Sequence, residues 1–238
     1  MTRQEAAIQY LENNYLQFNR LRYDVVGGKL QIRDTNNLWR EMTKQEINSA
    51  VCACAQEYQI NVTNREIITV LQSNIVPSVH PLREYVCACK DYVPEEPDWI
   101  DLVASQVRVL PSGDEAKDDE AKGEKLWRVC FKKWFVGMVA SWLKDEVVNH
   151  QVLVLIGRQG IYKTTWLEHL IPPHLRAYAC KLANSNDLNK DERLRIAEFG
   201  LISLDEIDSM NNRELNQLKS IITSTDVNER AAYAYSKE

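Results

Sequence analysis

Residues 152–165 read VLVLIGRQGIYKTT, and this stretch decides the fold of the second half of the chain. Together with Gln151, its aliphatic run predicts a buried β-strand over Gln151–Ile156. A turn of the form G-x-x-G-x-x-K-T-T follows, and a helix is expected after it. This order is typical of a phosphate-binding loop, in which backbone N–H groups and a helix N-terminus surround a polyphosphate.

Each residue type in this loop has a chemical role. Lys163 is expected to reach the β- and γ-phosphate oxygens, and Thr164 to ligate Mg²⁺. Tyr162 stands where the consensus has glycine, which puts hydrolysis in question more than binding. The alternative to a phosphate-binding loop is an ordinary strand–turn–helix segment that contains a lysine by chance. The predicted nucleotide-binding residues are Gly157, Arg158, Gln159, Gly160, Ile161, Tyr162, Lys163, Thr164 and Thr165.

Two adjacent acids form the second chemical signal. They follow the apolar run Leu201–Leu204, about 40 residues after the lysine. Asp205 is predicted to support Mg²⁺, and Glu206 to align or deprotonate the attacking water. Taken alone, either acid would more often be a solvated charge at the end of a strand, and it is their occurrence together downstream of Lys163-Thr164 that favours the metal site. With Lys163, these two acids make up the predicted catalytic set.

The rest of the second half predicts an α/β domain. A long amphipathic helix with three tryptophans is expected over 126–144, and Pro172 and Pro173 end the helix after the loop. A further helix near Asn186–Glu198 leads to a strand over Leu201–Leu204. Because helices alternate with apolar strands, parallel pairing is expected.

The first half predicts a mainly helical module over residues 1–110, with one hairpin. Helical spacing covers residues 3–18, and two strand-like runs flank Gly27-Gly28, which fits a tight primed turn. Thr43 to Glu46 and Thr63 to Glu66 form capping boxes, and Pro81 fits a first helical turn. A linker is expected over Pro111–Lys125, which contains six acids, three lysines and no large apolar residue.

Composition excludes several classes of protein. The 238 residues are 45% hydrophobic and 26% charged, with a net charge of −5, so the chain is neither disordered nor a strongly basic nucleic-acid clamp. The longest apolar stretch covers about ten residues, whereas a membrane span needs roughly twenty. A soluble, cytoplasmic protein with reduced thiols is expected. The pairs Cys52/Cys54 and Cys87/Cys89 have the wrong spacing for zinc and are interpreted as core thiols.

The motifs together resemble the virulence-associated E family of phage and mobile-element ATPases, which are related to primase–helicases. The resemblance is dense from residue 157 onward and thin before it. The matching stretches are HPLREYV (80–86), the tryptophan-rich helix, GRQGIYKTTW (157–166), the Pro-Pro pair at 172–173, AEFGLISLDEID (197–208), ELNQLKSIIT (214–223) and DVNERAAYAY (226–235).

This resemblance implies a P-loop NTPase core, similar to AAA+ and superfamily-3 helicases, over residues 126–238. It implies ATP and Mg²⁺ as cofactors, action on DNA in the replication of mobile elements or phages, and assembly into a ring. The third strand and arginine finger of such ATPases would follow residue 238, so a fragment of a longer protein is expected. A nucleotide-gated DNA-binding or assembly module with little hydrolysis is the alternative, and a small-molecule kinase ranks last.

Overall fold

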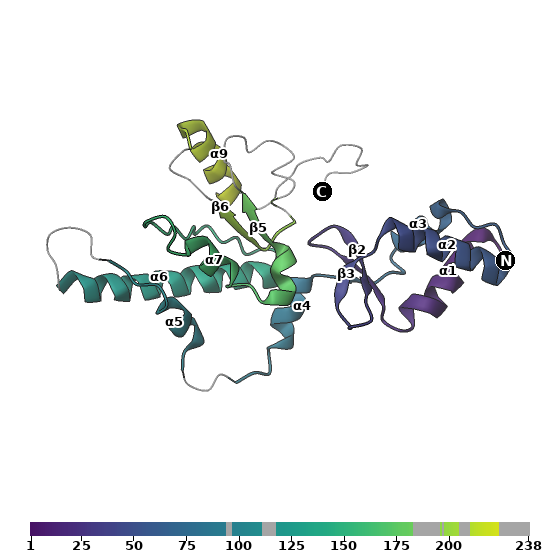
Figure 1. Cartoon of the computed structure of the whole chain (residues 1–238), viewed down its shortest axis with the longest axis horizontal. Coiled ribbons are helices and arrows are strands. Elements are labelled where there is room, and N and C mark those ends of the chain that lie inside the picture. Colours follow the sequence, from purple (N-terminus) through teal and green to yellow (C-terminus); the bar gives the residue numbers. More distant parts are fainter. Residues whose placement is uncertain (94–96, 111–117, 183–195, 197, 205–209, 224–238) are drawn as a thin grey trace. The chain divides into compact units, whose positions relative to one another are not determined.

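The computed structural model describes residues 1–93, 97–110, 118–182, 196, 198–204 and 210–223 (Figure 1). The chain divides into two compact units, Met1–Pro81 and Leu82–Glu238. This division lies before the predicted linker Pro111–Lys125, and from Asp118 onward that stretch is helical. Its alanine, glutamate and lysine residues are strong helix formers, so they extend the aromatic helix that follows.

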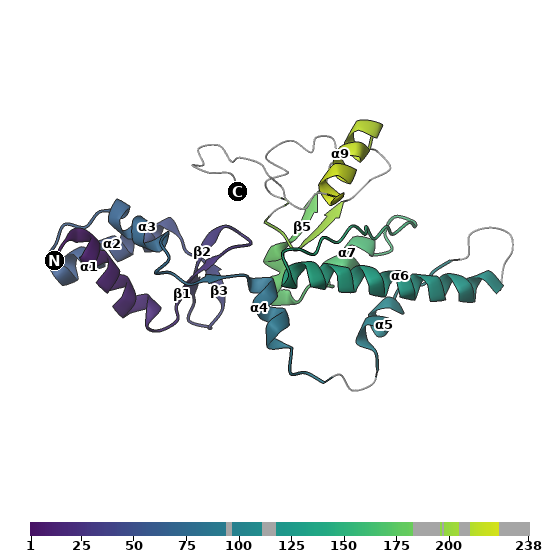
Figure 2. The same cartoon turned by 180° about the vertical axis from the view of Figure 1, so that it is seen from behind.

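The first unit packs three α-helices against a four-stranded sheet of order β3-β2-β1-β4 (Figures 1 and 2). Its helices are α1 (Arg3–Leu11), followed by the π-helical turn η1 (Glu12–Leu16), α2 (Lys44–Tyr58) and α3 (Asn64–Leu71). Its strands are β1 (Leu21–Asp24), β2 (Lys29–Arg33), β3 (Trp39–Glu41) and β4 (Ser78–Val79). The pairs β1–β2 and β2–β3 are antiparallel, and β1–β4 is parallel. The sheet is thus larger than the single predicted hairpin.

The core of the first unit lies between the helices and one face of the sheet. Leu21 of β1 and Ile32 of β2 are paired in register, and both are buried in one apolar cluster with residues of all three helices. Side chains alternate between the two faces of a strand. Arg22 and Gln31, which are also paired, therefore lie on the opposite face.

The predicted hairpin forms between β1 and β2, but the prediction of a two-residue primed turn is wrong. The turn covers the four residues 25–28, and of its two glycines only Gly28 has a positive φ, +62°. The Asp24 carboxylate accepts hydrogen bonds from the N–H groups of Val26 and Gly27 at 2.9 and 3.1 Å. This side chain shapes the turn, because Asp commonly binds backbone groups two or three residues on.

Both predicted capping boxes are confirmed. Thr43 precedes α2 and Thr63 precedes α3, and each pairs reciprocally with the glutamate three residues later. The backbone N–H of Thr43 donates to Glu46 Oε2 at 2.8 Å, and that of Thr63 donates to Glu66 at 3.0 Å. These bonds fix the start of each helix.

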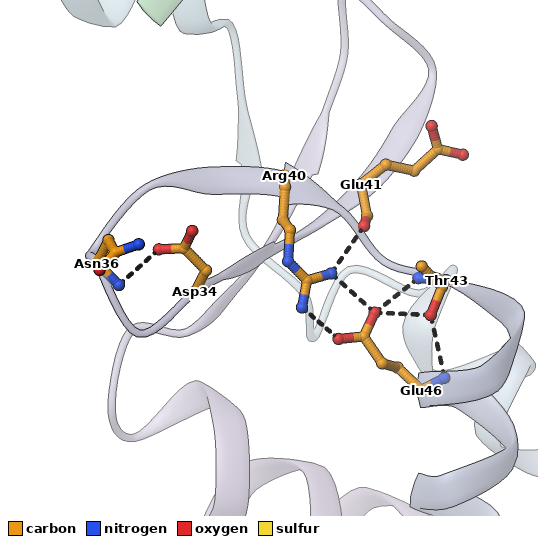
Figure 3. A network of polar contacts seen from close by, with 6 residues as sticks. All are labelled: Asp34, Asn36, Arg40, Glu41, Thr43 and Glu46. Carbon is orange, nitrogen blue, oxygen red and sulfur yellow. Dashed lines mark hydrogen bonds and ion pairs between the residues drawn. The ribbon is translucent and has the colours of Figure 1, made fainter.

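Glu46 has a second role, because it also binds Arg40 of β3 (Figure 3). The guanidinium donates from Nη2 to Oε1 at 2.6 Å and from Nη1 to Oε2 at 3.0 Å. Hydrogen bonds from Arg40, with a smaller contribution from Thr43, outweigh partial burial and lower the pKa of Glu46 from 4.5 to about 2. The pair ties the sheet to the first turn of α2.

We expect Glu46→Gln to destabilise the first unit in a pH-dependent way. Glutamine can still complete the capping box, so the substitution removes mainly the charge that binds Arg40. Because the folded pKa is lowered, the charge stabilises above about pH 4.5, and this contribution is lost as the pH falls towards 2. Thermal unfolding midpoints should differ most near pH 7 and converge near pH 2. A constant difference over this range would contradict the role of the charge.

The second unit begins with α4 (Pro81–Ala88) at the division. Its helices are α5 (Trp99–Ala104), α6 (Asp118–Leu143), α7 (Lys163–Glu168), the 3₁₀-helix η2 (Pro173–Tyr178) and α9 (Asn212–Thr223), and its strands are β5 (Ala179–Leu182) and β6 (Leu201–Leu204). The aromatic helix, the helix after the loop and the strand Leu201–Leu204 were all predicted and are confirmed. The parallel partner of β6 is β5, which was not predicted. Most of the predicted helix near Asn186–Glu198 lies outside the described residues.

The predicted strand Gln151–Ile156 is not a strand in the part of the chain that the structure describes. It forms no ladder, and its alternate residues Val152, Val154 and Ile156 are 49%, 57% and 94% exposed. An apolar run becomes a buried strand only when neighbouring strands bind both its backbone and its side chains. The P-loop fold of this unit therefore stays a prediction.

The core of the second unit centres on α6. Phe131 is fully buried, and its ring lies 5.4 to 5.9 Å from those of its four aromatic neighbours, Trp127, Trp134, Phe135 and Trp166. α5 packs beside this cluster: Trp127 Nε1 donates to Ala104 O at 2.8 Å, Asp101 pairs with Arg128, and Asp98, the N-cap of α5, pairs with Lys132, both at 2.5 Å. Among the described helices, none has the length and apolar character that crossing a bilayer demands.

Candidate phosphate-binding loop

The loop between Gly157 and Lys163 closes on itself through the lysine side chain. Lys163 Nζ donates to the backbone oxygens of Gly157 and Arg158, each at 2.8 Å. These acceptors precede the lysine by six and five residues, so the intervening backbone must curve around the ammonium group. An ammonium has three donors, so one N–H of Lys163 remains after these two bonds.

Two loop residues just before α7 have a left-handed backbone conformation. Gly160 has φ +82°, and Tyr162, the residue before the helix, has φ +61° and ψ +25°. Glycine takes this left-handed conformation without a steric cost, whereas a residue with a Cβ atom is disfavoured by about 1–2 kcal/mol. Tyr162 thus takes a left-handed conformation at the position where the consensus has glycine. A left-handed residue followed by a right-handed one turns successive N–H groups to the same side, which is an anion-binding arrangement.

Trp166 fixes the first turn of α7, and with it the end of the loop. Its N–H donates to Tyr162 O at 2.9 Å, and its indole Nε1 donates to Gln106 Oε1 at 3.2 Å. Its ring packs against Phe131 at 5.5 Å and Trp127 at 6.3 Å. The loop therefore ends on a helix that is attached to the core of the second unit.

The other end of the loop is positioned by Asn149. Its Nδ2 donates to Trp134 O of α6 at 3.2 Å, and its Oδ1 accepts from the N–H of Gln151 at 3.2 Å. The extended residues 151–156 therefore start from a fixed point on α6. Between this point and α7, residues 156–162 are all exposed, so the loop is open to solvent.

Only some of the predicted site residues lie in the part of the chain that the structure describes. Lys163 and Thr164 are half-buried at the start of α7, and Thr165 is exposed. Asp205 and Glu206 lie outside the described residues, so their predicted roles stay predictions. The strand that precedes them is well anchored: Gly200 donates from its N–H to Tyr178 O at 2.8 Å and accepts from Trp142 Nε1 at 2.9 Å.

The cysteines do not behave as predicted. Cys54 is buried in the core, but Cys52, Cys87 and Cys89 are exposed, so the interpretation of both pairs as core thiols is wrong for these three. Cys52 and Cys54 lie two residues apart on α2 and point to different faces of the helix. No group of three or more metal-binding side chains occurs among the described residues.

Two residues that support the loop were not predicted from the sequence. Trp166 follows the K-T-T motif directly, and a large aromatic residue in the expected helix could have marked the side that packs against the core. Asn149 carries no such signal, because a single asparagine in a polar stretch most often lies in a turn.

Comparison with known proteins identifies a family. A family model described as "Virulence-associated protein E-like domain" matches residues 117–238. A search of curated proteins found no match. The matched range contains α6, the loop, α7 and both strands of the second unit.

Proposed function

The chain belongs to the virulence-associated protein E-like family, and from this premise we propose that residues 157–165 bind the phosphate groups of ATP together with Mg²⁺. The family places it among proteins associated with phages and mobile elements. We propose that its second unit is a P-loop ATPase of the primase–helicase type, which acts on DNA in the replication of phages or mobile elements. Self-association into a ring is part of this proposal.

The position of the Lys163 ammonium carries the proposal. It lies within the curve of the loop, bound to two backbone oxygens, next to the left-handed residue that turns N–H groups to one side. A phosphate oxygen is a stronger acceptor than a carbonyl, because hydrogen bonds between ionised groups are shorter and stronger. A polyphosphate entering the loop would therefore compete well for this ammonium and meet the N-terminal amides of α7.

The remaining roles follow the chemistry of each residue type. Thr164, at the second position of α7, would bring a hydroxyl to the Mg²⁺ ion beside Lys163, and Asp205 would support the same ion. Glu206 would align or deprotonate the water that attacks the γ-phosphate. The ion supplies charge that stabilises the phosphate oxygens when ATP is bound.

Calorimetric titration with ATP, combined with a phosphate-release assay, tests the proposal. We expect ATP to bind in the presence of Mg²⁺, to bind more weakly after chelation, and to be hydrolysed to ADP and phosphate. Chelation removes the charge that offsets repulsion among the phosphate oxygens. The full chain should be used, with a chelated sample as the matched control. Absence of ATP binding under both conditions would contradict the proposal.

A second candidate is a nucleotide-gated assembly module without useful turnover. It is favoured by the apolar residues around the loop, because Ile156, Ile161 and Tyr162 are 94%, 55% and 78% exposed. Exposed apolar residues grouped in this way commonly become covered on association. The same assay separates the two candidates: binding without phosphate release, at every protein concentration, supports the assembly module.

A further inference from the structure

The sheet of the first unit carries arginines and one tryptophan on the face opposite its core. Arg22 of β1 and Arg33 of β2 place their Cζ atoms 4.1 and 5.2 Å from the centre of the Trp39 ring. Trp39 is paired with Arg33 in the register of β2 and β3. Arg20 lies opposite Arg33 on the other side, since its carbonyl accepts the Arg33 N–H at 2.9 Å. We call Arg20, Arg22, Arg33 and Trp39 the arginine–tryptophan cluster.

Arg22 of the cluster has polar partners, since its Nε donates to Gln31 Oε1 at 2.8 Å, but the described residues do not compensate the charges of Arg20 and Arg33. Like charges directly opposite each other on a sheet are destabilising. Neither the Arg20 nor the Arg33 side chain forms a hydrogen bond or ion pair with a residue that the structure describes. Arg33 Nε is also buried without a partner, which is costly for a charged group. An anion bound here would relieve both conditions.

The acids near the cluster are already engaged. Asp24, two residues beyond Arg22 on β1 and 2% exposed, accepts a hydrogen bond from Gln31 Nε2 at 3.1 Å, and Gln31 in turn accepts one from Arg22 Nε at 2.8 Å. Asp34 follows Arg33 directly, but its carboxylate accepts hydrogen bonds from the N–H groups of Asn36 (Figure 3) and of Leu38, each at 2.8 Å. Glu41 of β3 forms an ion pair with Lys29 at 3.2 Å. The compensating anion is therefore expected from outside this part of the chain.

We propose that the arginine–tryptophan cluster binds single-stranded nucleic acid, with Arg20 and Arg33 on successive phosphates and the buried Arg22 holding the Trp39 ring in place. Guanidinium groups match phosphate geometry, and the indole holds two of them in place by cation–π contact. Arginines and an aromatic ring on one sheet face are the combination that binds single strands with little sequence preference. An acidic peptide would also supply the negative charge, but it has no bases that could stack on an aromatic ring. The inference rests on the proposed action on nucleic acid, but not on ATP binding.

Fluorescence anisotropy of a labelled oligothymidylate tests this inference on the full chain. The double variant Arg20→Gln/Arg33→Gln should lose at least tenfold in affinity. Its salt dependence, the slope of log K against log salt, should be shallower by about 1.4, since each phosphate contact to a single strand contributes about 0.7. Lys44→Gln/Arg65→Gln is the matched control, because it removes the same charge from exposed positions on α2 and α3. Equal losses in both double variants would overturn the proposal.

Two further comparisons complete the test. Tighter binding of duplex DNA, or equal displacement of the oligonucleotide by polyglutamate, would also overturn it. If the double variant melts at a lower temperature, Arg20→Gln alone, at an exposed position, should still lose severalfold in affinity. ATP binding should be unchanged in the arginine variants, and oligothymidylate binding without nucleotide should be unchanged in Lys163→Ala. A failure of ATP binding alone would therefore contradict the proposed function and leave this inference standing.

Discussion

Lys163→Ala should lower the affinity of the chain for Mg²⁺-ATP by about 10- to 100-fold. Hydrogen bonds to charged groups contribute about 1.5–3 kcal/mol, and each 1.4 kcal/mol is a factor of ten in affinity. The substitution removes the ammonium that would bind the phosphate oxygens. It also removes the two 2.8 Å bonds that curve the loop. Both losses act in the same direction, so the effect on ATP should be the largest of any single substitution in the loop.

Lys144→Ala provides the matched control for this experiment. Lys144 is an exposed lysine just after α6, in the same unit as the loop. Its removal changes the net charge by the same amount and should leave ATP affinity unchanged within twofold. Calorimetric titration measures both variants. Undiminished affinity in Lys163→Ala, or an equal loss in Lys144→Ala, would contradict the assignment of the loop.

Phe131→Ala should destabilise the second unit by about 3–5 kcal/mol, the usual cost of removing a large aromatic side chain from a core. Phe131 is fully buried and its ring contacts four others, including that of Trp166 on α7. The cavity would therefore loosen the helix that ends the loop, so ATP affinity should fall as well. Urea unfolding followed by tryptophan fluorescence reports on this unit, because every tryptophan except Trp39 follows Pro81.

Val136→Ala is the control on the same helix. Val136 is 50% exposed, so its truncation should change the free energy of unfolding by less than about 0.5 kcal/mol. A similar loss in both variants would mean that α6 is not anchored through Phe131. A stable Phe131→Ala variant would contradict the central place of this ring in the core.

Local signals in the sequence predicted local structure well. The two capping boxes and the aromatic helix all depend on residues within a few positions of one another, and all three are confirmed. Membership in the virulence-associated protein E-like family was likewise visible in the motifs from Gly157 onward. Such features do not require knowledge of which segments meet in space.

Features that depend on distant partners were predicted poorly. The run Gln151–Ile156 has a strand-like composition, but whether it is a strand depends on neighbours that composition does not specify. The turn after β1 is a local feature that was nevertheless predicted wrongly, because the Asp24 side chain, rather than the two glycines, shapes it through bonds to residues two and three positions on. β5 was missed because its four residues include a lysine and a cysteine and carry no clear alternation. The support of the loop by Trp166 and Asn149 is of the same long-range kind.

The two bonds from Lys163 to the oxygens of Gly157 and Arg158 also bear on how spent nucleotide would leave. When ADP departs, a lysine with no other acceptor nearby would stay exposed until water replaced the phosphates. Here the backbone oxygens of Gly157 and Arg158 can accept hydrogen bonds from the Lys163 ammonium as soon as the phosphates leave. If the loop hydrolyses ATP as we propose, release of the product should therefore meet a lower barrier.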